Sequence, residues 1–564
     1  MGTSDRPEDP AADPRTDYDY AADAVARPGL VADLDDRVDG EVRFDDYSRQ
    51  LYATDASIYE VTPVGVVYPE STADVAAVVS YCAERSIPVL PRGGGTSLAG
   101  QTVNEAVVLD FTRHMDAVLA VDADERLARA EPGAILGELN AELAAHDLKF
   151  APDPAWGDKS ALGGAIGNNS TGAHSLQYGK TDAYVEACEV VLADGTVTRF
   201  GEVTLAELRE RADPEGGLES RIYAVLARIV DEEIDAVEAA FPELKRNVSG
   251  YNLDAFVAEA REALDAEAAA GGDGDDGEPA TVNVARLLAG SEGTLAIVTE
   301  ATVSLEPVPE TKGLALLTYD SLLDALEDVQ PILDHDPAAV EVLDDVLLDL
   351  AADTEEFGDL VDSVLPEGTG SVLLVEFYAE TDEEGRQRVA DLLADRVGDA
   401  EDAEGLGQAL VGAATTEADP AEGAADVTDA PVRAFAAREA HDEADRARFW
   451  KLRKSGLPIL LSRTTDAKHG SFIEDTAVPP ANLPAFVADF QAVLEEHDTY
   501  GPYFEALSYS GEHMIPRPTT SVWPNQRKII ASEVNAALRK EKSASDAASA
   551  MKKQLGAIEE QAGG

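Results

Sequence analysis

The sequence has little cysteine. Its 564 residues contain two, Cys82 and Cys188, whereas a four-cysteine iron–sulfur cluster needs four thiolates, so this chain cannot hold such a cluster by itself. Both cysteines stand in apolar runs that predict a helix and a strand. We therefore expect small buried side chains and no redox role.

Basic residues are also scarce. Lys and Arg number 44 against 110 Asp and Glu, which gives a formal net charge of −66, and this argues against sequence-independent binding to nucleic acid or to anionic membranes. Acidity of this kind is typical of proteins from the cytoplasm of a salt-accumulating halophile. Salt there screens the repulsion between like charges, since the Debye length is about 3 Å at 1 M salt. Disorder is the other explanation of a high charge, but 45% apolar residues in periodic runs argue against it for most of the chain.

Long apolar runs are missing as well. No run approaches the 18 to 20 residues of a membrane span, and the acidic stretch up to Arg27 lacks the apolar core of a signal peptide. We expect a cytoplasmic protein without a transmembrane segment, and peripheral membrane contact through an electron-acceptor partner stays open. Residues 1–40, rich in Asp, Pro and Ala, predict an acidic disordered lead-in.

The most informative stretch is glycine-rich. Three consecutive glycines within Pro91–Gln101 follow the apolar run Ile87–Leu90, and the successive backbone N–H groups of such a turn can bind an anion. Thr96 and Ser97 add hydroxyl donors, and Arg92 would offer positive charge to a pyrophosphate. The stretch is neither a Walker loop nor a G-x-G-x-x-G fingerprint. Taken alone, it is equally compatible with a surface turn.

Further motifs follow in order. They are Phe150–Pro154, Ser160–Gly172 with Gln177–Lys180, Arg246–Asp254 and Gly290–Glu300. Together with the first loop they resemble the flavin-binding domain of the vanillyl-alcohol-oxidase or p-cresol-methylhydroxylase (PCMH) superfamily. The likeness covers roughly residues 45–480. It is closest to the FAD-linked 2-hydroxy-acid dehydrogenases, a branch that includes cytochrome-type D-lactate dehydrogenase, the FAD subunit of glycolate oxidase and D-2-hydroxyglutarate dehydrogenase.

This resemblance implies an α+β fold. A PCMH-type FAD-binding domain of two subdomains would span residues 41–310, an α+β cap of the FAD-linked oxidase C-terminal type residues 311–503, and an atypical tail residues 504–564. FAD would be bound non-covalently, because the first loop contains no histidine, and His174 in the second stretch is expected to be an ordinary polar loop residue. The residues expected to bind FAD are Arg92, Gly93, Gly94, Gly95, Thr96, Ser97, Gln101, Pro152, Asp153, Gly163, Gly164, Asn169, Ser170, Gly172, Tyr178, Gly179, Glu292, Gly293 and Ile297.

The pattern along the chain fits such a protein. Ser71 and Asp74 predict the start of a helix over Val75–Arg85, Asp194-Gly195 predicts a tight hairpin turn, and a short helix beginning near Ser160 would turn its N-terminal amides to the cofactor phosphates. Residues 205–242 are expected to be largely helical, and 268–278 and 399–431 to be solvated insertions. In the cap, strands Gly313–Thr318 and Gly370–Glu376 would each precede a helix, at Leu322–Leu333 and Glu383–Val397.

Candidate catalytic residues come from the resemblance. By pattern alone Arg453 is a solvated helix cation, but the family has an arginine here that grips the substrate carboxylate, for which guanidinium is well shaped. Ile473 stands where the hydroxyglutarate enzymes have a lysine, which favours a monocarboxylic substrate.

The resemblance breaks after about residue 503. The family's His-x-Gly-x-Gly-x-x-His type motif, which with a later glutamate can hold a divalent metal, is absent, so the binding of Zn or Mn is in doubt. Ser510-Gly511-Glu512-His513 is either the family's late motif after an internal deletion, with His513 as candidate base beside Glu512, or a chance match. Residues 521–564 contain seven basic and five acidic residues, a departure from the acidic body that a frameshift, a truncation or a fusion would each explain.

The sequence thus predicts an FAD-dependent oxidoreductase. It would oxidise a small D-2-hydroxy acid, D-lactate or glycolate, to the 2-keto acid and pass the electrons to a separate acceptor, an iron–sulfur protein or a quinone. A non-catalytic or partner-dependent FAD-binding subunit is the first alternative. An oxidase of another alcohol or a sugar in the same superfamily is the second.

Overall fold

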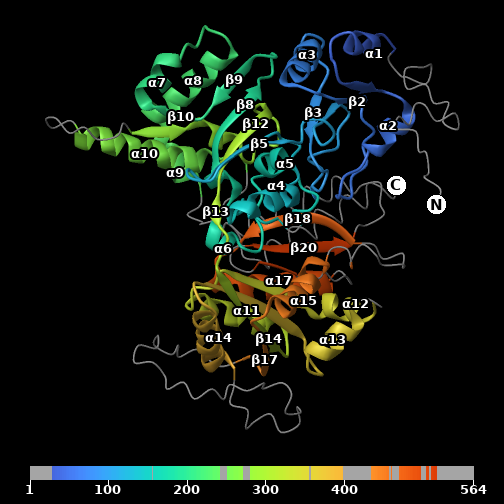
Figure 1. The fold of residues 1–564 in the computed structure, drawn as a ribbon, viewed down its shortest axis with the longest axis vertical. Coiled ribbons are helices and arrows are strands. Elements are labelled where there is room, and N and C mark those ends of the chain that lie inside the picture. The colour runs from blue at the N-terminus through green and yellow to red at the C-terminus, as the bar shows by residue number, and fades with distance from the viewer. Residues whose placement is uncertain are drawn as a thin grey trace.

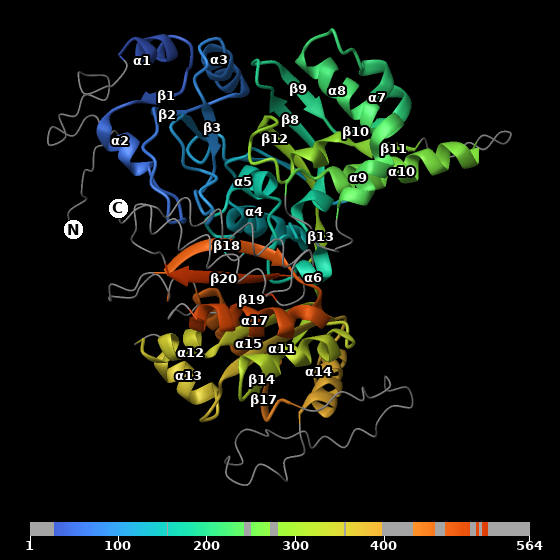
Figure 2. The same cartoon turned by 180° about the vertical axis from the view of Figure 1, so that it is seen from behind.

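The computed structural model describes residues 28–154, 156–241, 250–270, 280–354, 357–397, 433–456, 459, 469–496, 504–506 and 510–516. Figure 1 shows two lobes, with a pair of strands lying between them, and the view from behind in Figure 2 shows the same arrangement. We call the lobe built up to β13 the cofactor lobe and the lobe that begins at β14 the cap. None of the described helices combines the length and apolarity that crossing a bilayer requires.

The first sheet of the cofactor lobe has the order β1-β2-β4-β3, with β2, β4 and β3 parallel and β1 antiparallel at the edge. All residues of β2 and β4 are buried, which explains why these strands read as continuous apolar runs. The strands are β1 (Glu41–Arg43), β2 (Gly65–Tyr68), β3 (Val89–Arg92) and β4 (Val107–Asp110).

The second sheet is antiparallel, in the order β5-β6-β12-β8-β9. Buried and half-buried residues alternate along β12, as expected for a strand with one face on the core. The predicted Asp194-Gly195 turn is confirmed, with Gly195 at φ +86° between β8 and β9. The strands are β5 (Val118–Asp122), β6 (Leu127–Ala130), β8 (Val185–Val191), β9 (Val197–Phe200) and β12 (Ile297–Ser304), with the short pairs β7 (Leu148–Lys149) with β13 (Glu306–Pro307) and β10 (Glu202–Thr204) with β11 (Thr281–Asn283).

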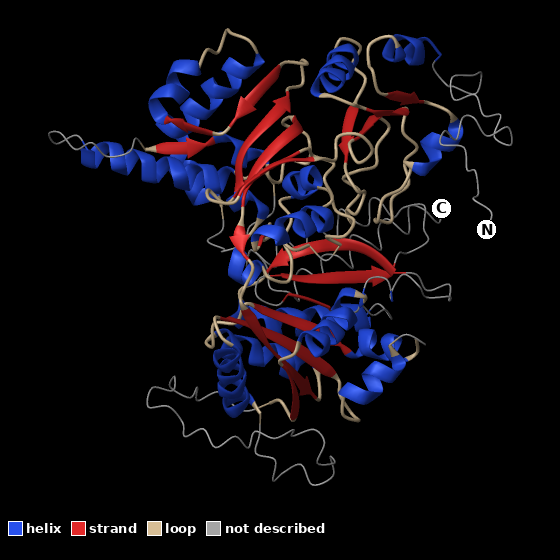
Figure 3. Cartoon of the chain, in the orientation of Figure 1, coloured by secondary structure: helices blue, strands red, loops and turns tan. Residues whose placement is uncertain are grey.

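Helices cover these sheets, as the blue ribbons of Figure 3 show. Ser71 caps α3 by accepting a hydrogen bond from the Asp74 amide, which confirms the predicted start. The helices of this lobe are α1 (Pro28–Asp35), α2 (Asp46–Leu51), α3 (Thr72–Ala83), α4 (Leu136–Leu143), α5 (Leu162–Asn168), α6 (Ser175–Tyr178), α7 (Leu205–Arg211), α8 (Leu218–Arg228), α9 (Ile234–Ala240) and α10 (Leu253–Ala270), with 3₁₀ turns at Ala144–His146, Thr181–Tyr184 and Val284–Leu288 and a π turn at Ile229–Glu233.

The predicted disordered lead-in is too long. Residues 28–40 contain α1, whose Leu34 is fully buried and belongs to the same hydrophobic cluster as Val75 and Val78 of α3. The Asp-rich composition hid this short apolar stripe. Residues 1–27 lie outside the described part of the chain, as do residues 271–278 of the insertion predicted at 268–278 and the whole of the loop predicted at 399–431. The first residues of that predicted insertion, 268–270, instead belong to the end of α10.

The cap contains a five-stranded antiparallel sheet, in the order β17-β14-β16-β15-β19, with helices on both faces. Alternate residues of β14 enter two different clusters: Ala315 and Leu317 pack with α11, α14 and α17, whereas Leu314 and Leu316 pack with α12, α13 and α15. The elements are β14 (Thr311–Tyr319), α11 (Leu322–Leu333), β15 (Ala339–Asp344), α12 (Asp345–Ala352), α13 (Gly358–Val364), β16 (Ser371–Ala379), α14 (Asp382–Arg396), β17 (Ala436–Ala440), α15 (Glu443–Lys454), a 3₁₀ turn at Pro480–Asn482, α17 (Leu483–Glu496) and β19 (Phe504–Ala506).

The α+β prediction is confirmed, and both predicted cap strands and both predicted helices are present. We propose a domain boundary between β13 and β14, close to residue 310. At the far end, β19 joins the cap sheet beyond residue 503, so we place the cap boundary after it. The pair between the lobes consists of β18 (His469–Ala477) and β20 (Ser510–Pro516).

Candidate functional site

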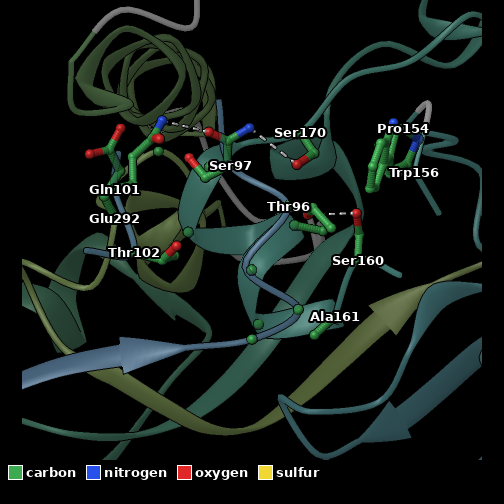
Figure 4. A pocket seen from close by; sticks show the side chains of 18 of the residues that line it. Thr96, Ser97, Gln101, Thr102, Pro154, Trp156, Ser160, Ala161, Ser170 and Glu292 are labelled. Atoms are coloured by element: carbon green, nitrogen blue, oxygen red, sulfur yellow. Dashed lines mark hydrogen bonds between the residues drawn. The ribbon is translucent and has the colours of Figure 1, made fainter. Parts of the chain in front are cut away.

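One cavity of about 620 Å³ runs along the cofactor lobe to the cap. Figure 4 shows that its walls come from the first glycine loop, from the segment around α5 and from the loop before β12. Helix α15 of the cap closes it with Trp450, Arg453 and Lys454. Lining residues as far apart in the sequence as Pro91 and Lys454 therefore face the same space.

The first glycine loop is pressed against the second stretch. A Cβ on Gly94 would lie 1.9 Å from the carbonyl oxygen of Lys159, a distance that no side chain allows. Thr96 Oγ1 lies 3.0 Å from Ser160 Oγ, as the dashed line in Figure 4 marks. The glycines thus let two backbone segments approach each other beside the cavity.

The second stretch is organised by α5. The amides of Leu162 and Gly163 donate to the carbonyls of Ala134 and Pro132, at 2.8 Å each. These two amides therefore anchor the start of α5 to the segment between β6 and α4 and are not available to cofactor phosphates. For the rest of the helix the expectation stays a prediction. Gly164 is different: it lines the cavity, and a Cβ there would meet no atom within 4 Å.

The third stretch is held against α5. The amides of Gly290 and Glu292 donate to the carbonyls of Ile166 and Gly167, at 3.0 and 2.8 Å. Burial raises the pKa of Glu292, which lies at the cavity wall with φ +51°. Its neighbour Gln101 belongs to a chain of side-chain hydrogen bonds, visible in Figure 4, that continues through Asn168 to Ser170 at 3.3 Å per step.

Arg92 ties the first glycine loop to neighbouring backbone. Its Nη1 donates to the Thr102 carbonyl at 3.0 Å and its Nη2 to the Thr54 carbonyl at 2.8 Å, and its guanidinium lies over the ring of Tyr52. Burial lowers its pKa, partly offset by Asp55. These contacts favour a role in fixing the loop more than direct contact with a pyrophosphate.

Most of the predicted cofactor residues line the cavity. They are Arg92, Gly93, Gly94, Gly95, Thr96, Ser97, Gln101, Asp153, Gly163, Gly164, Ser170, Gly172, Glu292 and Gly293.

Five predicted residues are not among those that line it. Asn169 ends α5 in a left-handed conformation and accepts from the Asp182 amide, Ile297 is buried in the core at the start of β12, and Tyr178 lies under the Lys149 ammonium, 4.2 Å from its ring centre. The other two are Pro152, which precedes the lining residue Asp153, and Gly179, which follows Tyr178.

Arg453 reaches the cavity from the cap. It is 7% exposed and forms an ion pair through its Nε with the fully buried Glu341 of β15. The neighbouring Lys454 Nζ lies 3.9 Å from Asp153 Oδ2 of the cofactor lobe. Two cations of α15 therefore stand at the cap end of the cavity, and the carboxylate-binding role that the resemblance implies for Arg453 stays a prediction.

Sequence reasoning missed several lining residues. Trp450 lies one helical turn before Arg453, so the i, i+3 spacing was a signal for it. Ser160 was expected as part of a motif and at the start of a helix, and Tyr251 as part of a motif, but neither was predicted to line the site. Trp156, which also packs against the cap core, had no recognisable signal.

The cavity suits a flavin nucleotide. The Oγ of Ser97 is buried at the loop without a hydrogen-bond partner among the described residues, so a polar ligand atom would satisfy it. Around it stand hydroxyl and amide side chains and backbone, which bind phosphate and ribose oxygens. The open space at Gly164 would accept ligand atoms that a side chain there would displace.

The two C-terminal candidates stay predictions. Glu512 and His513 lie on β20, and His513 is paired with Ile473 of β18 in the backbone register, but their side chains lie outside what the structure describes. Within the described ranges, no three His, Cys, Asp or Glu residues come together as a group that could hold a metal ion. Both cysteines are buried and unpaired with each other, and burial raises the pKa of each thiol.

Solved structures with the same fold are known. An alkyldihydroxyacetonephosphate synthase matches over 92% of this chain and 82% of its own, with a TM-score of 0.55 at 16% identity. A 4-ethylphenol oxidase from Gulosibacter chungangensis matches over 86% and 82%, with a TM-score of 0.52 at 16% identity. At such identities these matches describe the fold alone.

Curated relatives are closer in sequence. A D-2-hydroxyglutarate dehydrogenase of Pseudomonas putida is 30% identical over 468 residues, which is 82% of this chain and 41% of the relative. The glycolate oxidase subunit GlcD of Bacillus subtilis is 30% identical over 346 residues, or 60% of this chain and 57% of the relative. The chain thus spans about two fifths of the length of the D-2-hydroxyglutarate dehydrogenases that it matches.

Two family models match in the order of the two lobes. Residues 63–201 match an FAD binding domain, and residues 308–510 match the C-terminal domain of FAD linked oxidases. The first contains two of the glycine stretches and the second contains Arg453, which face one cavity. The chain therefore belongs to the FAD-linked oxidases of the vanillyl-alcohol-oxidase or PCMH superfamily.

Proposed function

We propose that this chain binds FAD non-covalently and oxidises a small D-2-hydroxy acid, D-lactate or glycolate, to the 2-keto acid. The electrons would pass to a separate acceptor such as an iron–sulfur protein or a quinone. The observation that carries the proposal is the single cavity that joins the glycine loops to Arg453 and Trp450 of the cap. The relatives named for 2-hydroxy-acid oxidation support it.

The chain's own residues would bind and orient. The glycine loops and the hydroxyls of Thr96 and Ser97 would hold the cofactor, while Arg453 would hold the substrate carboxylate through charge-assisted hydrogen bonds. Trp156 and Trp450 would exclude water from the same space. The bound flavin supplies the hydride acceptor. His513 beside Glu512 is our candidate for accepting the hydroxyl proton.

A monocarboxylic substrate is favoured by two observations. Ile473 occupies the position of a lysine in the hydroxyglutarate enzymes. In addition, Arg453 is assigned to the first substrate carboxylate and Lys454 already faces Asp153 at 3.9 Å, so a second substrate carboxylate would compete with Asp153 for Lys454.

We expect a corresponding order of substrates. In steady-state reduction of an acceptor dye at high salt, kcat/KM should be higher for D-lactate or glycolate than for D-2-hydroxyglutarate. The value of kcat/KM for D-2-hydroxyglutarate should be lower by about tenfold or more, because its second carboxylate would lack a dedicated cation. One unsatisfied charge contact costs about 1.4 kcal/mol or above. A preference for D-2-hydroxyglutarate would contradict our substrate assignment while leaving the reaction class intact.

Two observations favour a partner-dependent alternative. The sequence lacks the family's two-histidine motif, and no candidate metal group is present within the described ranges. If the active site needs residues from another subunit, the isolated chain would bind FAD yet fail to turn over any of the three substrates, with or without Mn²⁺ or Zn²⁺. Recovery of turnover when the chain is co-expressed with its neighbouring gene products would establish this alternative.

A further inference from the structure

The two lobes meet at a buried histidine. His174 immediately precedes α6 in the cofactor lobe, and its side chain is 9% exposed. Its Nε2 lies 2.8 Å from Glu376 Oε1 on β16 of the cap, and its Nδ1 lies 3.4 Å from Asp153 Oδ2 in the cofactor lobe. One imidazole therefore bridges a carboxylate of each lobe, which is more than the ordinary polar loop role that the sequence predicts.

The geometry sets the charge of this ring. Both nitrogens face carboxylate oxygens, which only accept hydrogen bonds when they are ionised, so both nitrogens can donate at the same time only if the ring is an imidazolium. Burial alone would lower the pKa of His174, but the hydrogen bonds to Asp153 and Glu376 outweigh it and raise the pKa above its ordinary 6.5. For the carboxyls of Asp153 and Glu376 burial acts in the opposite direction and would raise the pKa. His174 and nearby lysines outweigh it and bring the pKa of each carboxyl down to about 2.

The same contacts reach the cavity wall. Glu376 Oε2 accepts a hydrogen bond from Trp450 Nε1 at 2.7 Å, and the His174 ring packs beside the Trp450 indole with centroids 5.3 Å apart. Trp450 lines the cavity, as do Asp153 and, one turn later on α15, Arg453. The bridge thus fixes the position of the cap helix that presents these side chains.

We propose that His174, in its imidazolium form, is a positioning residue that locks the cap onto the cofactor lobe and holds Trp450 and Arg453 against the cavity. The substrate end of the site is then assembled only while His174 carries its proton. This inference rests on the proposed function for its kinetic consequence, but the bridge itself does not.

The remaining charged groups at the junction come from several elements. Lys312 of β14 donates to Glu376 Oε1 at 3.1 Å, and Lys454 of α15 faces Asp153. These two cations stay when His174 loses its proton. They keep the carboxylates ionised. Lys312 pairs within the cap, and Lys454 crosses the lobe boundary to Asp153 at 3.9 Å, but neither contacts a carboxylate of each lobe at once, as the imidazolium does.

Two further titratable groups, Lys149 and Tyr378, lie nearby. Lys149 of β7 packs over the rings of Tyr178 and Tyr378, and burial together with Lys312 lowers its pKa to about 8. Tyr378 of β16 stacks on His174 with centroids 5.7 Å apart, and burial raises its pKa, so it stays neutral. Lys149 must therefore be separated from His174 in any pH experiment.

The sign of the pH dependence follows. Because the pKa of His174 is raised on folding, the bridge is fully present below about 6.5, the ordinary value of histidine, and is lost as pH rises through the raised value. We expect KM for D-lactate to increase about 3- to 30-fold across that range, the size typical of coupling through an intermediate contact, while FAD content stays constant.

The test compares four proteins at high salt between about pH 5.5 and 9.5. In His174→Gln, KM should already be raised at low pH, and the increase of KM with pH, which we call the limb, should vanish. His335→Gln is the matched control, because His335 pairs with Asp395 inside the cap at 3.0 Å and crosses no lobe boundary; it should keep the limb. Lys149→Met should keep it too. A limb retained in His174→Gln, or lost in His335→Gln or Lys149→Met, would overturn the proposal.

A second readout needs no turnover. The NMR signal of His174, assigned by its disappearance in His174→Gln, should titrate above 6.5 in the wild-type protein and move down in Glu376→Gln. Titration at or below 6.5 would contradict the bridge. If instead the signal titrates as expected while no variant shows turnover, the bridge stands and the proposed function fails.

Discussion

Replacing Arg453 by alanine is expected to lower kcat/KM for D-lactate by about 30- to 5,000-fold. Truncation of one partner of a buried, hydrogen-bonded charge pair costs about 2–5 kcal/mol, and each 1.36 kcal/mol is a factor of ten. FAD content should not change, because the glycine loops that would hold the cofactor belong to the other lobe. The measurement is steady-state dye reduction at high salt, with bound flavin determined from the absorption spectrum of each preparation.

The stability of this variant needs its own control, since Glu341 is left buried without its partner, at a cost of about 3–5 kcal/mol. In Arg453→Met/Glu341→Leu both charges are removed, so stability should return while activity stays low. Arg448→Ala removes an exposed arginine of the same helix, paired only at the surface with Asp445, and should alter neither. Wild-type turnover in a folded Arg453→Ala protein would refute the assignment.

The second large effect is expected at Gly172. A Cβ at this position would lie 1.7 Å from the carbonyl oxygen of Asp153 and 2.3 Å from its carbon. Both are backbone atoms, so the two segments must separate in Gly172→Ala. We expect the protein to lose about 1–3 kcal/mol of stability, as overpacked sites do, and to purify without flavin.

Gly164 offers the matched comparison. Since a Cβ there meets nothing within 4 Å, Gly164→Ala should fold with unchanged or slightly higher stability. Gly164→Leu should also fold, but its side chain would occupy the cavity and weaken FAD binding in a titration. Normal FAD affinity in Gly164→Leu would mean that the cofactor does not use this part of the cavity.

The sequence allowed local features to be predicted well. The bounds of α11 match the predicted Leu322–Leu333, and the turn at Gly195 has the expected positive φ. These features depend on neighbours in the chain, such as an Asp-Gly pair or an apolar face of period 3.6. The antiparallel order of the cap sheet was not predictable in this way, because it depends on pairings over long separations.

Strand β15 shows why. Its residues are all buried, yet Ala339–Asp344 includes two acidic residues, which argue against a buried strand in a sequence. Glu341 is tolerated there because Arg453, 112 residues later, pairs with it. A buried charge can be anticipated only when its partner is known, and that partner is supplied by the tertiary fold.

The candidate site likewise contains residues that could be predicted from the sequence and residues that could not. The glycine stretches were found because their composition is unusual, and the place of Arg453 because a family resemblance supplied it. The bridge at His174 was missed, since nothing local distinguishes a histidine in a polar loop from one that meets a carboxylate of another lobe. Its partner Glu376 lies 202 residues away.

The central claim is that one cavity holds both FAD and a 2-hydroxy acid. The most direct measurement is anaerobic addition of D-lactate or glycolate to the purified chain with bound FAD in high salt, followed by the flavin absorption spectrum. Our account predicts that the oxidised flavin band bleaches with formation of one 2-keto acid per flavin, and that Arg453→Ala bleaches far more slowly. A protein that takes up no FAD, or whose bound flavin stays oxidised with every 2-hydroxy acid tried, would contradict it.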